Sequence, residues 1–502
     1  LLLQGPKTPQ KLRQILNFIK VQTTSLKNII TLKNSPFKIL LLVLVVVLLL
    51  IPLQWVPALT IGGYEVKRVA LLSDVIDEEN SGGDGAEALP EVPPLPVVPA
   101  LATPGEGGGT TTQTANAQTQ PTTPAPKGVT PILDYSASGT HGMAPFYRAL
   151  NKRNELGRPV RIAYFGDSFI EVDILTAPLR EELQRKFGGH GVGYLDIAPP
   201  YAANRATVRQ RYGGWTAHCV LDKGRYKRDL LNIGQRYFQP QGTGWTEVSG
   251  VRMPGLDSAE VHTIYLRANA PVNVGVKLDN GPMLALNAEG NGRIEALKRS
   301  GRAGKVRWQV PAASGLVCWG VAEESKTGVI VDNLSLRGSS GVTLAEIPQR
   351  NLNELHSVRP YDLIVLQFGL NVANKTQKNY SAYMAQMKRV IDHLKQSFPE
   401  AGILLVGVGD RVNRMSDGEL HTLPGIIALS RYQQKLAADC GIAFWNLFEA
   451  MGGEGSIKRM AEAKPAEAGK DYTHINARGG KRIANYLFKS MVYGHEQYRK
   501  AP

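Results

Sequence analysis

Four short polar segments carry residue types that could together perform nucleophilic catalysis. They are Gly166-Asp167-Ser168, Gly338-Ser339-Ser340, Gly369-Leu370-Asn371 and Asp471-Tyr472-Thr473-His474. A serine hydroxyl is a weak nucleophile and needs an adjacent base. Histidine can take its proton near neutral pH, and a carboxylate close to that histidine can orient the imidazole. The residue types therefore predict Ser168 as nucleophile, His474 as base and Asp471 as the orienting carboxylate.

Acyl transfer through a serine also needs fixed donors for the developing oxyanion. The predicted donors are the backbone N–H groups of Ser168 and Gly338 and the side-chain amide of Asn371. Each signal is weak alone, because Ser168 also fits a helix cap and the other two fit ordinary loops. The order of the four segments, three at strand ends and one before the last helix, favours catalysis. His190 and His218 compete for the role of base, but neither lies in an Asp-x-x-His arrangement.

The elements that must position these segments are apolar runs typical of buried parallel strands. Predicted strands cover residues 161–165, 328–336, 361–368, 402–408 and 442–447, and predicted helices cover 172–187, 380–398, 426–440 and 478–493. This alternation predicts an α/β fold, a three-layer doubly wound parallel sheet of flavodoxin-like type. Active groups of such sheets collect at the carboxyl ends of the strands.

The stretch between the first and second strands has a different character. Over residues 213–326, short β-like runs alternate with Gly, Asn and Pro turns. This pattern predicts an inserted β-sandwich of jelly-roll type, a possible carbohydrate-binding module. The α/β domain is then discontinuous, over 140–212 and 327–502. Candidate sugar-stacking residues are Trp215, Trp245, Trp308 and Trp319, although the last two lie within strand-like runs and fit a core position better.

The N-terminal third predicts export. Residues 39–59 are apolar except for Gln54, and about 20 such residues span a membrane. A transmembrane signal anchor is predicted, with a buried core helix or cleavage near Ala58 as alternatives. Residues 1–38 carry seven basic residues and no acid, which places them in the cytoplasm. Residues 60–139 are a Pro/Thr/Gly-rich linker whose composition is typical of an extended stalk.

Charge and cysteines limit the partners. The net charge is +15, and residues 131–502 hold +14 of it. In an exported domain this favours an anionic glycan or surface over nucleic acid, and a general solvated basic surface explains it equally well. The three cysteines show no metal-ligand spacing, so no metal or cofactor is expected. Cys219 and Cys318 either pair or remain free thiols like Cys440.

Taken together, the four segments resemble the SGNH (GDSL-like) hydrolase family, named for its Ser, Gly, Asn and His. The segments ending at Ser168, Gly338, Asn371 and His474 are similar to blocks I, II, III and V of that family. Block III usually continues with Asp, where this chain has Val372. A narrower resemblance, to envelope peptidoglycan O-acetylesterases with a carbohydrate-binding-like β-module between blocks I and II, is carried by residues 166–180, 187–194, 213–216, 444–447 and 451–453.

The resemblance implies a serine carboxylic ester hydrolase. It would remove O-acetyl groups from cell-envelope polysaccharide, peptidoglycan above all, through an acyl-enzyme on Ser168. One alternative is an O-acetyltransferase of the same fold, supplied with acyl groups by a membrane partner. Another is a non-catalytic glycan-binding envelope protein. With the signal anchor, the expected location is the bacterial inner membrane, crossed once, with the catalytic domain in the periplasm.

Overall fold

The computed structural model describes residues 60–61, 64–65, 89–94, 125–137, 139–222 and 224–500. The chain divides into two units, Leu1–Ala86 and Glu87–Pro502. In the first unit only an antiparallel pair is described, β1 (Thr60–Ile61) and β2 (Tyr64–Glu65). The predicted transmembrane segment 39–59 lies outside the described residues. Among the residues that are described, no helix has both the length and the apolar character needed to cross a membrane.

A six-stranded sheet forms the centre of the second unit. Its order is β14-β4-β15-β16-β19-β3, and all pairs are parallel except β3 on β19. The strands are β3 (Leu133–Asp134), β4 (Val160–Gly166), β14 (Val329–Ser335), β15 (Leu363–Gln367), β16 (Gly402–Val406) and β19 (Ala443–Trp445). Residues of β4, β15 and β16 are buried throughout, as expected for parallel strands covered on both faces.

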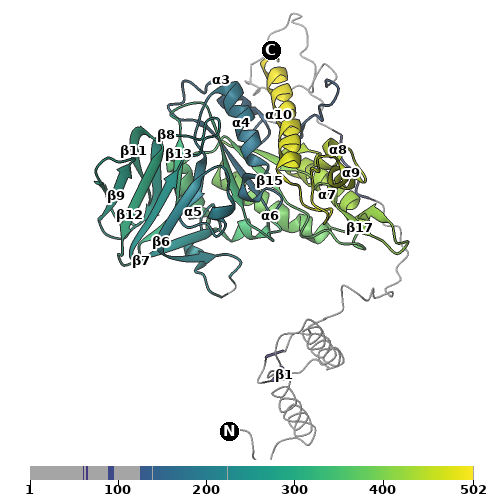
Figure 1. Ribbon diagram of the computed structural model, residues 1–502. Coiled ribbons are helices and arrows are strands. Elements are labelled where there is room, and N and C mark those ends of the chain that lie inside the picture. Colours follow the sequence, from purple (N-terminus) through teal and green to yellow (C-terminus); the bar gives the residue numbers. More distant parts are fainter. Residues whose placement is uncertain are drawn as a thin grey trace, which may run out of the picture. The chain divides into compact units, whose positions relative to one another are not determined.

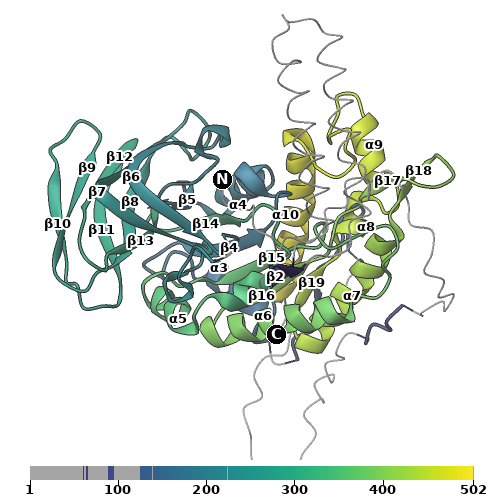
Figure 2. The same ribbon diagram turned by 90° about the horizontal axis from the view of Figure 1, so that it is seen from below.

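Helices cover both faces of this sheet (Figure 1). One face carries α3 (Ala144–Asn151), α4 (Thr176–Phe187) and α10 (Ala477–Lys500). The other carries α5 (Gln349–Val358), α6 (Ser381–Ser397) and α7 (Pro424–Cys440), which lie side by side in Figure 2. The short helices α8 (Leu447–Met451) and α9 (Ser456–Glu462) and the hairpin of β17 (Val412–Arg414) and β18 (Leu420–Thr422) complete this domain. The predicted doubly wound α/β fold is confirmed.

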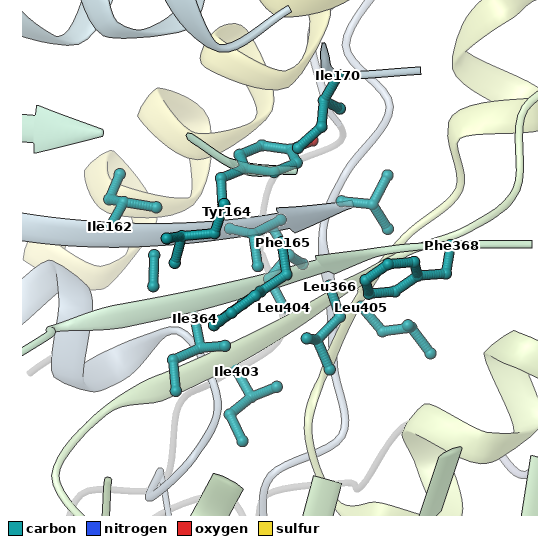
Figure 3. Packing of buried hydrophobic residues seen from close by; sticks show 14 of the residues in the cluster. Ile162, Tyr164, Phe165, Ile170, Ile364, Leu366, Phe368, Ile403, Leu404 and Leu405 are labelled. Carbon is teal, nitrogen blue, oxygen red and sulfur yellow. The ribbon is translucent and has the colours of Figure 1, made fainter. Parts of the chain in front are cut away.

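Side chains of neighbouring strands pack in register within the sheet (Figure 3). Phe165 of β4 stands beside Leu366 of β15, which stands beside Leu405 of β16. All three are at most 1% exposed. Burying side chains of this size contributes about 2 kcal/mol each, so this layer is a main source of stability. The packing also fixes where each strand ends along the sheet edge. The polar segments that contain Ser168, Gly338 and Asn371 follow these strand ends.

The inserted module is a separate antiparallel sheet. Its order is β10-β9-β12-β7-β13-β8-β11, with β5 on β13 and β6 on β7. The strands are β5 (Gly193–Asp196), β6 (Arg209–Cys219), β7 (Arg236–Ser249), β8 (Ala259–Arg267), β9 (Val272–Leu278), β10 (Leu284–Ala288), β11 (Ile294–Ala303), β12 (Lys305–Pro311) and β13 (Val317–Glu324). β7 pairs with β12 along one part and with β13 at Phe238. The two halves of the sheet therefore enclose one core, which includes Trp308 and Ile264.

The inserted β-rich segment predicted from the sequence is thus present as an antiparallel sheet. Its strands begin earlier than residue 213, because β5 and the start of β6 already belong to it. Trp308 and Trp319 are core residues, 0% and 2% exposed, whereas Trp215 and Trp245 are half-buried. The three cysteines are free thiols.

A buried ion-pair network joins the module to the α/β domain. Arg359, which follows α5, contacts Asp332 of β14 at 2.6 Å and Glu324 of β13 at 2.8 Å. Arg161 of β4 contacts the same Glu324 at 2.9 Å. Burial raises the pKa of Glu324, but the two guanidinium groups outweigh it and hold this pKa well below its usual range. Removing one partner from such a network is strongly destabilising, so the two domains are held in one arrangement.

Candidate active site

Three strand ends meet at one edge of the parallel sheet. Ser335, the last residue of β14, stands beside Gly166 of β4, which stands beside Gln367 of β15. The polar segments of Gly338, Ser168 and Asn371 follow these ends within four residues. The sheet register therefore brings together three segments that lie up to 203 residues apart in the chain (Ser168 to Asn371).

Ser168 lies in a tight turn directly after β4. Phe169 donates its N–H to Asp167 Oδ1 at 2.9 Å, and Glu171 donates its N–H to the Ser168 carbonyl at 3.4 Å. A 3₁₀ turn, η2 (Glu171–Asp173), comes next, and α4 begins only at Thr176. The predicted helix start at residue 172 was wrong, because Val172, inside this turn, has a φ of +51°, a left-handed conformation that does not continue into an α-helix.

Side-chain contacts hold this strained turn in place. Val172 and Asp173 both have positive φ, which costs on the order of 1–3 kcal/mol for residues other than glycine. The buried Asp173 carboxylate accepts hydrogen bonds from Arg180 at 3.2 Å, Arg205 at 2.9 Å and Thr207 at 2.5 Å. Burial raises the pKa of Asp173, and the two arginines more than offset this, so the carboxylate is ionised in the folded chain. The turn that presents Ser168 is therefore anchored from both domains.

The three predicted catalytic side chains lie in contact. Ser168 Oγ lies 3.0 Å from His474 Nε2, and His474 Nδ1 lies 2.7 Å from Asp471 Oδ2. An ionised carboxylate only accepts hydrogen bonds, so Nδ1 carries the proton and Nε2 turns its lone pair toward the serine hydroxyl. This tautomer is the one in which His474 can accept the Ser168 proton.

Backbone donors fix Asp471 in turn. Its Oδ1 accepts the N–H groups of Thr473 at 3.2 Å and His474 at 3.1 Å. Partial burial raises the pKa of Asp471, but the hydrogen bonds from His474 and Thr473 outweigh it, so this pKa lies below its usual value. About half of the Asp471 and His474 side chains is exposed, 52% and 47%. The base is therefore accessible to water.

The closing helix places His474 against the nucleophile turn. Asn476 caps α10 by accepting the N–H of Arg478 at 2.9 Å. Gly480, in the first turn of this helix, packs so closely that a Cβ atom would lie 1.9 Å from the Ile174 carbonyl oxygen. A larger residue at position 480 would push α10 away from the turn. The segment before this helix is thus held at a fixed distance from Ser168.

The predicted oxyanion donors occupy the same edge of the sheet. Within the described part of the chain, the backbone N–H groups of Ser168 and Gly338 donate to no other group. Gly338 has a φ of +75°, which favours glycine. Asn371 Nδ2 donates to Asp167 Oδ2 at 2.9 Å and to the Ser339 carbonyl at 3.0 Å. Both of its hydrogens are engaged, so donation to an oxyanion requires Asn371 to release Ser339.

The block III aspartate that is missing here has a local substitute. Val372 packs against the apolar core, and Asn371 is oriented by Asp167 instead. Asp167 is 2% exposed. Burial raises the pKa of Asp167 to about 6, against the opposing effects of the Phe169 N–H, His474 and Asn371.

Two residues that support the nucleophile were not identified from the sequence. Asn333 donates to the Ile170 carbonyl and to Thr176 Oγ1, both at 2.7 Å, and so ties β14 to the turn after Ser168. Asp173 anchors the same turn. The sequence signal for the role of Asp173 was its spacing of seven residues from Arg180, about two helical turns, because this spacing allows the two side chains to pair beside one helix. The competing histidines make other contacts.

Those contacts lie within the module. His190 faces Glu260 at 3.8 Å, and His218 stacks on Tyr237 at 4.5 Å between ring centroids. His474 is therefore the histidine that contacts the nucleophile among the residues that the structure describes.

Comparison with known proteins places the fold. No family model and no curated protein matches the sequence. A solved peptidoglycan O-acetylesterase matches with a TM-score of 0.59 and 21% identity over 73% of this chain and 99% of that one. A family two carbohydrate esterase from Cellvibrio japonicus matches at 10% identity, covering 62% of this chain and 99% of that one, with a TM-score of 0.24. A family 2 carbohydrate esterase with a carbohydrate-binding domain from Corynascus thermopiles (Myceliophthora fergusii) matches at 12% identity, covering 57% and 99%, with a TM-score of 0.25.

The first of these likenesses confirms, at the level of the fold, the resemblance carried by the sequence motifs. It extends over almost the whole length of the solved esterase, so the shared architecture includes more than the parallel sheet.

Proposed function

We propose that this chain is a serine ester hydrolase that removes O-acetyl groups from a cell-envelope glycan, with peptidoglycan as the expected polymer. The observation that carries the proposal is the contact series from Ser168 to His474 to Asp471, at 3.0 and 2.7 Å. The fold shared with a peptidoglycan O-acetylesterase supports the choice of substrate.

In the first step, Ser168 Oγ attacks the acetyl carbonyl carbon while its proton passes to His474 Nε2. The charge on the carbonyl oxygen is stabilised by the N–H groups of Ser168 and Gly338, and by Asn371 once it releases Ser339. The bond to the sugar oxygen then breaks, and that oxygen takes the proton from His474. The glycan leaves with a free hydroxyl, and the acetyl group stays on Ser168.

In the second step, water gives a proton to His474 and attacks the acetyl-serine carbonyl. The bond to Ser168 Oγ breaks, Oγ regains its proton from His474, and acetic acid leaves and loses its proton to solvent as acetate. Water is the proposed acceptor, and the exposure of His474, 47% of its side chain, lets water reach this base. The hydrogen bond from Asn371 to Asp167, the residue directly before Ser168, keeps this amide at the nucleophile turn and supports its assignment as an oxyanion donor.

The test uses the purified full chain with 4-nitrophenyl acetate and with O-acetylated peptidoglycan, measuring released acetate. Ser168→Ala is expected to lower kcat at least about 1000-fold, because nucleophile and base act as a unit. Ser381→Ala, an exposed serine at the start of α6, is the matched control and should keep full activity. A fluorophosphonate adduct should map to Ser168.

If Ser168→Ala remains active, the assignment of the nucleophile is wrong. If an added glycan acceptor becomes acetylated faster than acetate appears, the reaction is transfer instead.

We further propose that residues 39–59 anchor the chain in the bacterial inner membrane, with the catalytic domain in the periplasm. The support is the apolar run and its basic N-terminal flank. Alkaline phosphatase, which is active only outside the cytoplasm, can be fused to the C-terminus. An active fusion that stays with membranes after carbonate washing is the expected result, and an inactive one contradicts the orientation.

A further inference from the structure

A small hollow lies where the inserted module meets the nucleophile turn. The α/β domain contributes Glu171 and Ser335, and the module contributes Tyr201, Arg205 and Arg236. Its volume of about 60 Å³ holds a few water molecules and cannot enclose a sugar ring. A ring would lie across the open mouth, with a single substituent reaching inside.

The hollow adjoins both sides of the proposed acyl site. Glu171 donates its N–H to the Ser168 carbonyl at 3.4 Å. Ser335 stands beside Gly166 at the end of β14 and precedes Gly338 by three residues. A group bonded to an acetyl ester at Ser168 would therefore have the hollow as a neighbour.

The walls offer many hydrogen-bonding groups with little net charge. Arg205, Arg236, Asp196 and Glu171 line the hollow. Arg236 pairs with Asp196, Glu171 pairs with Arg337, and Arg205 pairs with the buried Asp173. The lining therefore places guanidinium donors beside carboxylate acceptors, and the opposite charges compensate each other. Such a wall fits the hydroxyl or acetamido groups of a neutral sugar, which both donate and accept hydrogen bonds. An anionic ligand would face the carboxylates at close range.

An aromatic residue completes the rim. Tyr201, in the module loop after β5, is 40% exposed. The Arg337 guanidinium lies 4.9 Å from the centroid of its ring and connects it to the strand end that leads to Gly338. An exposed ring beside polar side chains provides an apolar surface for the C–H face of a pyranose.

We propose that this hollow and its rim form the subsite for the pyranose ring that carries the ester, with a ring whose substituents are neutral and polar, such as acetamido groups, as ligand. Tyr201 contacts the ring, and the paired side chains bond its polar substituents. The inserted module is then part of the catalytic cleft as well as a separate binding unit. The proposal rests on the proposed function, since it assigns the sugar next to the acetyl group at Ser168.

The test compares two substrates of the full chain, O-acetylated peptidoglycan and 4-nitrophenyl acetate, which has no sugar. Tyr201→Ala is expected to lower the ratio of their kcat/KM values about tenfold or more, mainly through KM for the glycan. Tyr201→Phe keeps the ring and should restore the ratio. Met283→Ala, which alters an equally exposed apolar side chain elsewhere in the module, is the control and should leave the ratio unchanged.

Direct binding separates this proposal from the proposed function. In the Ser168→Ala background, a tetramer of β-1,4-linked N-acetylglucosamine is titrated and the Kd is measured by calorimetry. Adding Tyr201→Ala should weaken binding about tenfold. An unchanged Kd, or an equal loss of activity toward both substrates, overturns the subsite. If Ser168→Ala keeps its activity toward both substrates, the proposed function is overturned. The binding result still tests the subsite in that case.

Discussion

Asp167 provides a test of how burial shapes the site. This carboxyl lies directly before the nucleophile, is 2% exposed, and accepts hydrogen bonds from Phe169 and Asn371, both at 2.9 Å. Burial raises its pKa from 3.8 to about 6. The proposed change is Asp167→Asn, which keeps the size of the side chain and removes its titration.

The magnitude follows from linkage. Because the folded-state pKa lies above the unfolded one, the folded chain binds the proton more tightly between the two values. The resulting stabilisation is fully present below the unfolded pKa of about 3.9 and is lost as the pH rises through the folded-state value. A shift of about two units corresponds to about 3 kcal/mol. The free energy of unfolding of Asp167→Asn, relative to the wild type, should therefore rise by about 3 kcal/mol between about pH 4 and about pH 8.

Urea unfolding followed by tryptophan fluorescence measures this difference at each pH. A constant offset from altered hydrogen bonds to Asn371 cancels, since only the change with pH is used. Asp257→Asn, at an exposed aspartate of the module, controls for the substitution itself. A difference that stays flat across the pH range would refute the reasoning, because it would mean that the folded chain does not hold the Asp167 proton.

The remaining predictions concern the catalytic groups and the domain junction. Asp471→Asn should lower kcat for 4-nitrophenyl acetate about 100-fold with KM nearly unchanged, because an amide cannot hold the same tautomer of His474. The loss should be smaller than in a buried triad because the Asp471 side chain is half-exposed. Asn371→Ala should lower kcat about 100- to 1000-fold, as expected for one oxyanion donor, and an unchanged kcat would remove it from the site. Arg359→Met leaves the buried Asp332 without its arginine and should lower the free energy of unfolding, measured by urea titration, by about 3–5 kcal/mol. Adding Asp332→Asn should recover part of this loss. An unchanged free energy of unfolding in Arg359→Met would contradict the network.

The parallel sheet was readable from the sequence because its strands are buried on both faces. The run 161–165 is apolar apart from Arg161, and the run 402–408 has no polar side chain; they coincide with β4 and β16 within two residues. The strand ends also predicted that Ser168, Gly338 and Asn371 lie near one another, since the carboxyl ends of parallel strands meet at one edge of the sheet. Local sequence composition was therefore sufficient to predict the strands that are buried on both faces.

The module and the supports of the nucleophile depend on contacts that local patterns do not contain. β7 contains Pro240 and two glycines, so it does not look like a strand, yet it connects both halves of the module. Asp173 is fixed by Arg205, 32 residues away and across the domain junction. Nothing near either residue in the sequence indicates the other, so this anchor could be found only in the folded chain.

The geometry of the insertion explains why a module can contribute to the cleft without disturbing the sheet. The chain leaves the α/β domain at Gly188 and returns at Val329, whose N–H bonds the Gly188 carbonyl at 2.9 Å. The two stems therefore touch, and the entropic cost of the intervening loop grows only slowly with its length. From there β5 runs along the edge strand β14, where Tyr194 donates its N–H to Asp332 at 2.8 Å (Figure 2). The module thus covers an edge that would otherwise be exposed, and its next loop brings Tyr201 to the carboxyl end of the same strand.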